Sequence, residues 1–406
     1  MTATFEQAAR SWTEHLRAGG STPWSQWVVT GADDQVTVPP GWTAPGAAQL
    51  EFVRRAAALT EHGFPAGLAD LVFGRSGPAR GLAHLPLGWP GTMTPRPFGP
   101  PRTDPADVPG HELVRVGVGA LTELLLRSPG QEPGDWRVRR RLLTRDPSFE
   151  LAGAPVTVAA VRRALAVAGH VEGGHAPRVV LLAEPFDAGL AQVWSARAQR
   201  GAPARWRGFV ARTAHRQGLP PSIDLPGLAG SWAPRVGREN VHVLVAPGSG
   251  ATAARLAAEV LGLSLRNRLH GRRAPDAGPR VLDLTPAAVD VVRRVNAVLA
   301  VRATEQQQAR ATRTLSSLLV GVHGSPRDPL TVPRPFQDWA RERGAWITDE
   351  LRRGGYAVHG NLDRIVPAFE GVPVHPDRDT VLRLVLTACV RLASTGERLR
   401  TKERER

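Results

Sequence analysis

The chain has 406 residues, of which 42% are hydrophobic, and it carries a formal net charge of +15 at pH 7. Its 52 Lys+Arg residues include only one lysine, Lys402, so no lysine Schiff base or Walker-type phosphate-binding lysine is available before the C-terminal tail. The single cysteine, Cys389, excludes an internal disulfide and a zinc site built from several thiolates. No secretory signal pattern or long apolar run occurs, and we expect a cytoplasmic protein without a membrane span.

The positive charge is concentrated after residue 110, because acidic and basic residues nearly balance before it. The densest basic cluster is Arg137–Arg141, followed by Arg145. This excess would allow a polyanion to bind through counterion release, although no familiar nucleic-acid-binding motif occurs. A solvated surface or a linker is the alternative interpretation of the cluster.

The first 85 residues are expected to form an N-terminal helical region. Apolar residues recur at helical spacing from Phe5 to Leu16, and the pattern continues over 45–63 and 66–73. Repeated prolines in 86–110 predict a Pro-rich linker or an extended loop that follows the surface. Residues 111–146 are expected to form a helix followed by a basic linker.

From residue 147 onward, short β-rich runs alternate with helical segments. The runs lie at 149–152, 178–183 and 241–245, and a helix is expected after each of them. This alternation predicts an α/β fold with a parallel, doubly wound sheet flanked by helices. The last part of the chain is helical, and the predicted helices are 286–298, 306–319, 336–353 and 377–392. We expect one α/β domain with C-terminal helices over 147–396 and a charged tail at 397–406.

Two stretches carry a recognisable pattern. In the first, Leu-Ala-Gly-Ser-Trp-Ala-Pro-Arg-Val-Gly (228–237) precedes the strand Val-His-Val-Leu-Val (241–245) and a helix ending in Val-Leu-Gly-Leu (260–263). In the second, Gly-Gly-Tyr-Ala-Val-His-Gly-Asn-Leu-Asp (354–363) leads to a Val-Pro pair. Both stretches resemble actinobacterial sulfotransferase-like proteins, over roughly 148–263 and 280–370. The resemblance implies a P-loop-like fold and sulfuryl transfer from 3′-phosphoadenosine-5′-phosphosulfate.

The phosphosulfate loop of that family runs Gly-x-Pro-Lys-Thr-Gly-Thr-Thr, and the matching stretch here is Gly-Ala-Pro-Val-Thr-Val-Ala-Ala (153–160). Gly153, Pro155 and Thr157 agree with the pattern. The lysine, the second glycine and the two last hydroxyls are replaced by Val156, Val158, Ala159 and Ala160. These changes remove the positive charge, the close backbone approach and the side-chain donors that a phosphate needs.

The second nucleotide-binding element of the family is altered as well. The family has an Arg after the second strand and a Ser one or two helical turns later, which together bind the 3′-phosphate. Here Glu184 replaces the Arg and Gln192 replaces the Ser, although Trp194 agrees with a family tryptophan. A carboxylate repels a phosphate. The resemblance therefore implies a degenerate cofactor site, formed by Gly153, Ala154, Pro155, Thr157, Arg162 and Glu184.

Three functions remain open, and the sequence leaves undecided whether the chain is an enzyme. The first is a sulfotransferase-like pseudoenzyme without a cofactor, which binds or scaffolds an unknown protein or small-molecule partner. The second is an active transferase that uses 3′-phosphoadenosine-5′-phosphosulfate, with Arg162, Arg163 or Arg178 in place of the lysine. The third is a basic nucleic-acid or polyanion binder.

The remaining patterns identify no catalytic residue. The histidines lack metal-binding spacing, so no metal site is expected. His170, Glu172 and His175 lie on a glycine-rich loop, which is either an exposed connection or an acid–base pair at the carboxyl edge of the sheet. Gly-Ser-Gly at 248–250 is either a tight turn or a phosphate-binding turn.

Overall fold

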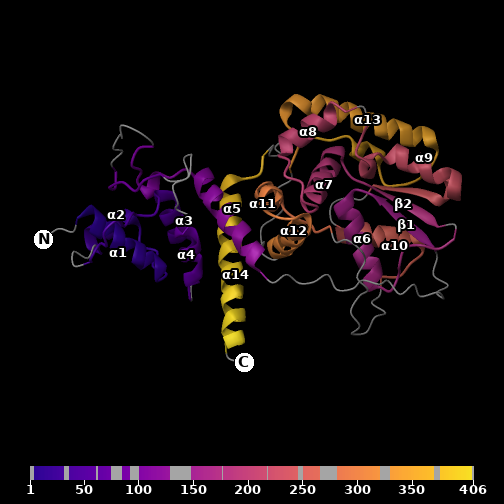
Figure 1. The fold of residues 1–406 in the computed structure, drawn as a ribbon. Helices are drawn as coiled ribbons and strands as arrows, with labels where there is room; N and C mark the ends of the chain where they lie inside the picture. Colours follow the sequence, from indigo (N-terminus) through magenta and orange to yellow (C-terminus); the bar gives the residue numbers. More distant parts are fainter. Residues whose placement is uncertain are drawn as a thin grey trace. The chain divides into compact units, whose positions relative to one another are not determined.

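The computed structural model describes residues 4–31, 36–60, 63–74, 85–91, 100–128, 148–175, 177–216, 218–245, 250–265, 281–320, 330–369 and 375–404. The chain divides into two compact units (Figure 1). Unit 1 comprises residues 1–130, 290–323 and 377–406, and unit 2 comprises residues 131–289 and 324–376. None of the described helices has the length and apolar character needed to cross a membrane.

Unit 1 is mainly helical. Its elements are α1 (Phe5–Arg17), α2 (Trp24–Thr30), α3 (Ala47–Ala57), α4 (Ala66–Phe73), η1 (Pro105–Asp107), α5 (Gly110–Arg127), most of α11 (Pro286–Arg302), α12 (Glu305–Val320) and α14 (Arg378–Arg404). The first helix begins with a capping box, in which Thr4 and Gln7 exchange side-chain and backbone hydrogen bonds. Gly117 brings α5 close to its neighbours, because a Cβ there would lie 2.3 Å from Val385 and 2.5 Å from Phe52.

The described part of the Pro-rich segment packs against unit 1. The Trp24 indole donates a hydrogen bond to the Gly88 carbonyl at 2.9 Å, and the Gly88 amide donates to the Thr103 carbonyl at 2.9 Å. Trp89 stacks on Trp24 with the ring centroids 6.1 Å apart. Of the two interpretations of 86–110, the loop that follows the surface agrees with these contacts.

The grouping of the helices differs from the predicted division of the chain. The sequence predicted that the C-terminal helices belong to the α/β domain at 147–396, but α12, α14 and most of α11 lie in unit 1 with the N-terminal helices. The reason is the apolar face of α14, which packs along α5: Val385 is fully buried, and the Cys389 thiol lies 3.6 Å from the Gly117 carbonyl. Helical periodicity identifies an apolar face without indicating which distant helix it will contact.

Unit 2 contains a four-stranded parallel sheet flanked by helices, so the α/β prediction is confirmed. The strands are β1 (Phe149–Gly153), β2 (Arg178–Ala183), β3 (Val241–Val245) and β4 (Ala357–His359). The surrounding helices are α6 (Pro155–Val167), α7 (Phe186–Ala198), α8 (Trp206–Ala214), α9 (Leu225–Val236), α10 (Gly250–Leu261) and α13 (Gln337–Gly354). Short 3-10 turns complete the unit: η2 (Pro221–Ile223), η3 (Arg238–Asn240), η4 (Arg334–Phe336) and η5 (Leu362–Ile365).

Helices lie on both sides of this sheet. Helices α6 and α10 pack against one face, and Figure 1 shows α9 and α13 on the other side. Alternate residues of the strands point into the core under α6 and α10, and its largest members are Phe149, Leu151, Val161, Leu165, Val180, Leu182, Leu244 and Leu261. Burying each such side chain contributes about 1.5–3 kcal/mol to stability, so this layer fixes the position of α6 on the sheet.

The strand order follows the chain order, β1-β2-β3-β4. Doubly wound folds reverse their strand order at a switch point, where ligands bind, and the four described strands show no such reversal. The finer expectation of a P-loop-like winding is therefore not confirmed. Because β1 and β2 are parallel neighbours, their carboxyl ends lie together and bring the segments that follow them into contact.

Candidate functional site at the amino end of α6

The predicted donor loop begins where β1 ends. Gly153 has φ +122°, and a Cβ on it would lie 2.2 Å from the Leu182 carbonyl oxygen on β2. The Ala154 amide donates to that same oxygen at 3.2 Å. Pro155 is the first residue of α6, where its missing N–H removes no helical hydrogen bond. Gly153 and Pro155, two of the three residues that match the family loop, are thus explained by the strand-to-helix turn alone.

The amino end of α6 is capped by a side chain from α7. Ala154 occupies the N-cap position and offers no side-chain acceptor. Instead, the Gln192 side-chain oxygen accepts hydrogen bonds from the Val156 amide at 3.0 Å and from the Thr157 amide at 3.1 Å. These are the N2 and N3 donors that an N-cap residue normally satisfies, and they are also the donors that would face a bound phosphate.

Thr157 and Glu184 complete this network. The Thr157 hydroxyl donates to the Glu184 carboxylate at 2.6 Å and accepts from the Gln192 amide nitrogen at 3.0 Å. Burial raises the pKa of Glu184, and the hydrogen bonds from Thr157 and Gln192 oppose that rise. A carboxylate therefore lies at the helix end where the family places a phosphate, and it contributes negative charge whenever it is ionised.

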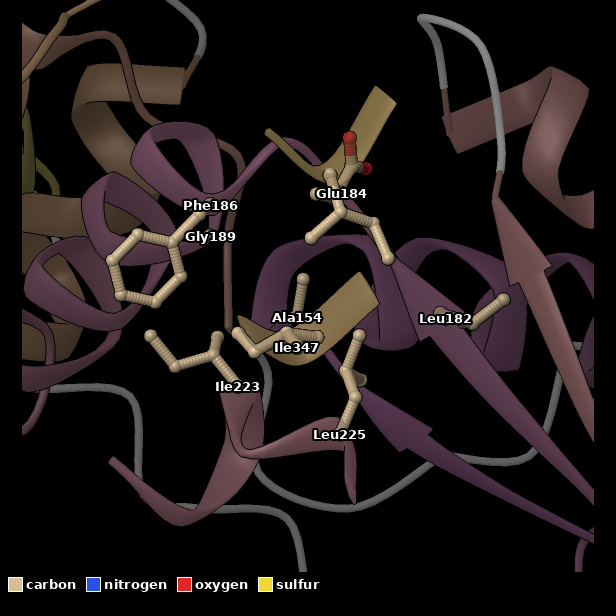
Figure 2. A pocket seen from close by; sticks show the side chains of 9 residues that line it. Ala154, Leu182, Glu184, Phe186, Gly189, Ile223, Leu225 and Ile347 are labelled. Atoms are coloured by element: carbon tan, nitrogen blue, oxygen red, sulfur yellow. The ribbon is translucent and has the colours of Figure 1, made fainter. Parts of the chain in front are cut away.

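The space beside this network is small. A cavity of about 10 Å³ is bordered by Ala154 and Glu184 and otherwise by apolar residues of β2, α7, α9, α13 and two turns, most of which are labelled in Figure 2. Its apolar lining includes Leu182, Phe186, Ile223, Leu225 and Ile347. In Figure 2 the Glu184 carboxylate points away from these side chains. This volume is about what one water molecule needs, so the cavity has no room for a nucleotide.

The arginines proposed as replacements for the lysine lie elsewhere. Arg162 forms an ion pair with Glu172, whose other oxygen accepts from the Arg162 Nη2 at 3.0 Å and from the Leu151 amide at 3.0 Å. Arg163 is exposed and also lies about two turns beyond the start of α6. Arg178 begins β2, about 16 Å of extended chain away from the carboxyl end of that strand.

The structure separates the members of the glycine-rich loop. His170 is buried, and its Nε2 lies 3.0 Å from the Ser264 carbonyl oxygen, whereas His175 is exposed. Glu172 is held by Arg162 beside β1. His170 and Glu172 thus have separate partners, and the interpretation of the loop as an acid–base pair stays a prediction. The Gly248–Ser249 turn and the Arg137–Arg145 cluster lie outside the described residues.

Two polar groups of unit 2 were not identified from the sequence. Asp187, at the start of α7, accepts from the Thr331 hydroxyl at 3.1 Å, and burial raises the pKa of Asp187. His242 Nδ1 on β3 lies 3.2 Å from His359 Nε2 on β4, and burial, followed by the neighbouring His359, lowers the pKa of His242. Recognising the histidine pair would have required recognising β4, whose three residues are too few for a clear period-two pattern.

The network at α6 has the chemistry of a structural cap. It offers no cation for an anion, and within the described ranges no group of three or more His, Cys, Asp or Glu side chains could hold a metal ion. Comparison with protein-family models, curated protein sequences and solved structures found no match to this chain. The assignment of a function therefore depends on the residues themselves and on the resemblance noted in the sequence.

Proposed function

We propose that the chain is a sulfotransferase-like protein with a P-loop-like ancestry that has lost its phosphosulfate donor site and acts by binding or scaffolding. The observation that carries this proposal is the position of Gln192. Its side-chain oxygen already accepts from the Val156 and Thr157 amides, at 3.0 and 3.1 Å. A phosphate that approached the amino end of α6 would have to displace this internal acceptor.

Four contacts that the family makes with its nucleotide are missing here. Charge-assisted hydrogen bonds contribute about 1.5–3 kcal/mol each. The family's lysine, its two hydroxyls and its 3′-phosphate arginine correspond here to Val156, Ala159, Ala160 and Glu184. Four losses at the low end amount to roughly 6 kcal/mol, and about 1.4 kcal/mol is a tenfold change in affinity, so a micromolar site would move beyond the millimolar range.

The positions of the arginines weigh against an active transferase. Arg162 is occupied by Glu172, and Arg178 lies at the amino end of β2, at the opposite end of the strand from Glu184. A guanidinium near the phosphosulfate would have to come from another part of the chain. Catalysis by these arginines is therefore not the function that we propose.

Two measurements test the proposal. Thermal unfolding is followed with and without 3′-phosphoadenosine-5′-phosphosulfate, because a ligand that binds only the folded state must raise the melting temperature. Sulfuryl transfer to a panel of phenols and alcohols is measured in parallel, with a sulfotransferase that has an intact loop as the positive control. We expect no turnover by the chain, and no shift in its R197Q/R212Q variant, which lacks two exposed arginines that lie outside the α6 network and could hold the nucleotide elsewhere. Turnover above the uncatalysed rate would contradict the proposal.

A further inference from the structure

The surface formed by α7, α8 and the residues that connect them is unusual in its charge. Residues 188–223 contain no Asp or Glu, and their arginines are Arg197, Arg200, Arg205, Arg207, Arg212 and Arg216. All six side chains are exposed. None of them forms an ion pair with any residue that the structure describes.

Two surface arginines of α13, in the same unit, are neutralised locally. On α13, Arg341 pairs with Asp338 at 2.7 Å, and Arg353 pairs with Glu350 at 2.6 Å. The α7–α8 surface lacks such partners, so its positive potential is not cancelled by its own sequence. An unpaired cluster of this kind attracts polyanions and releases their counterions when it binds them.

An apolar pocket opens among these arginines. It has a volume of about 350 Å³, and Trp194, Phe209 and the Ala202–Ala204 segment line it between Arg197 and Arg212. The Arg197 guanidinium lies over the Phe209 ring, 5.4 Å from its centroid. The Trp194 indole donates to the Ala204 carbonyl at 2.8 Å, which fixes the connecting segment. A volume in this range accommodates a small planar group, and no acidic side chain lines the pocket.

We propose that the α7–α8 surface binds single-stranded nucleic acid, with phosphates on the exposed arginines and one base in the pocket. The arginines alone would suit any polyanion, but the pocket favours a chain that carries a flat apolar group beside each charge. The Trp194 and Phe209 rings are each 2% exposed, so the group open to a base is the Arg197 guanidinium that lies over Phe209. Arginines add such cation–π contacts where proteins hold single strands without reading their sequence. A duplex keeps its bases stacked and cannot place one in the pocket. This inference is independent of the proposed loss of the donor site.

The test measures fluorescence anisotropy of a labelled oligothymidylate of about 12 nucleotides at several salt concentrations, with the full chain. For single strands the logarithm of the binding constant falls with the logarithm of salt by about 0.7 for each neutralised phosphate. The double variant R197Q/R212Q should lower this slope by about 1.4 and weaken binding about tenfold at low salt. The control R163Q/R255Q removes two exposed arginines of α6 and α10 in the same unit, which form no ion pair with a described residue, and it should bind like the parent.

A second pair of measurements tests the pocket. Ala202→Trp fills it while all six arginines remain, and an abasic oligomer of equal length removes the bases while the phosphates remain. Each change should weaken binding about 2- to 30-fold, because a cation–π contact with one base contributes about that factor. Equal binding of the abasic oligomer would overturn the nucleic-acid assignment in favour of a generic polyanion surface. If R197Q/R212Q and R163Q/R255Q lost the same amount of affinity, the α7–α8 surface would not be the binding site. No binding by the parent would also overturn the proposal.

Discussion

Replacing Gln192 by alanine should destabilise unit 2 measurably, although the side chain lies far from the centre of the core. Its oxygen accepts from two backbone amides of α6, and its nitrogen donates to the Thr157 hydroxyl at 3.0 Å. Removing a capping side chain costs about 0.5–2 kcal/mol. Because Thr157 is buried, water replaces the lost acceptor poorly, and we expect a cost near the upper end, about 2 kcal/mol.

Urea unfolding of the parent and of Gln192→Ala, followed by far-UV circular dichroism, measures this cost from the shift in midpoint. Gln306→Ala is the matched control, since Gln306 lies on the exposed first turn of α12. It should change stability by less than about 0.5 kcal/mol. If Gln192→Ala cost no more than the control, the internal cap would be too weak to exclude a phosphate, and the reasoning for the closed site would fail.

Three further predictions concern titrating groups. Burial raises the pKa of Glu184, so above about pH 4.5 the folded state holds a proton that the unfolded chain releases, and stability falls as the pH rises. Glu184→Gln should flatten this fall, measured as urea midpoints across the pH range, and should stabilise the protein at neutral pH. The pKa of His242 is lower in the folded state, so below about pH 6.5 the unfolded chain binds more protons than the folded protein. Stability should therefore decrease as the pH falls below about 6.5, and it should decrease less in His242→Gln. Burial strongly raises the pKa of the Cys389 thiol, so a maleimide should label this cysteine only after the protein unfolds. Mass spectrometry measures the labelling, and rapid labelling of the native protein would contradict the buried position of Cys389.

The sequence predicted the elements of the fold better than their assembly. The runs at 149–152, 178–183 and 241–245 predicted three parallel strands, because apolar runs followed by helices have few other solutions. The strand Ala357–His359 was missed, since its three residues between Tyr356 and Gly360 are too few to show a clear alternation. The pairing of α5 with α14 was missed as well, because apolar periodicity carries no information about the partner of a helix.

The sequence predicted which residues form the candidate site, but it did not predict how they are arranged. Thr157 was singled out as a position that agrees with the family motif, and Glu184 and Gln192 as positions where it is altered. The structure brings all three together. The sequence presented Glu184 and Gln192 as losses. Gln192 is instead a replacement, which caps a helix from a position 35 residues away along the chain, and no local pattern indicates such a contact.

The claim that the donor site is closed is tested most directly by isothermal titration of 3′-phosphoadenosine-5′-phosphosulfate into R197Q/R212Q. This double variant lacks the two arginines of the α7–α8 pocket, so the nucleotide cannot bind there instead. The titration is repeated after adding Val156→Lys. Restoring the lysine leaves Gln192 on the two amides and Glu184 beside Thr157, so we expect no binding at physiological salt in either protein. Micromolar binding by R197Q/R212Q would contradict a donor site that the protein's own side chains occupy. Micromolar binding that appears when Val156→Lys is added to R197Q/R212Q would contradict it as well.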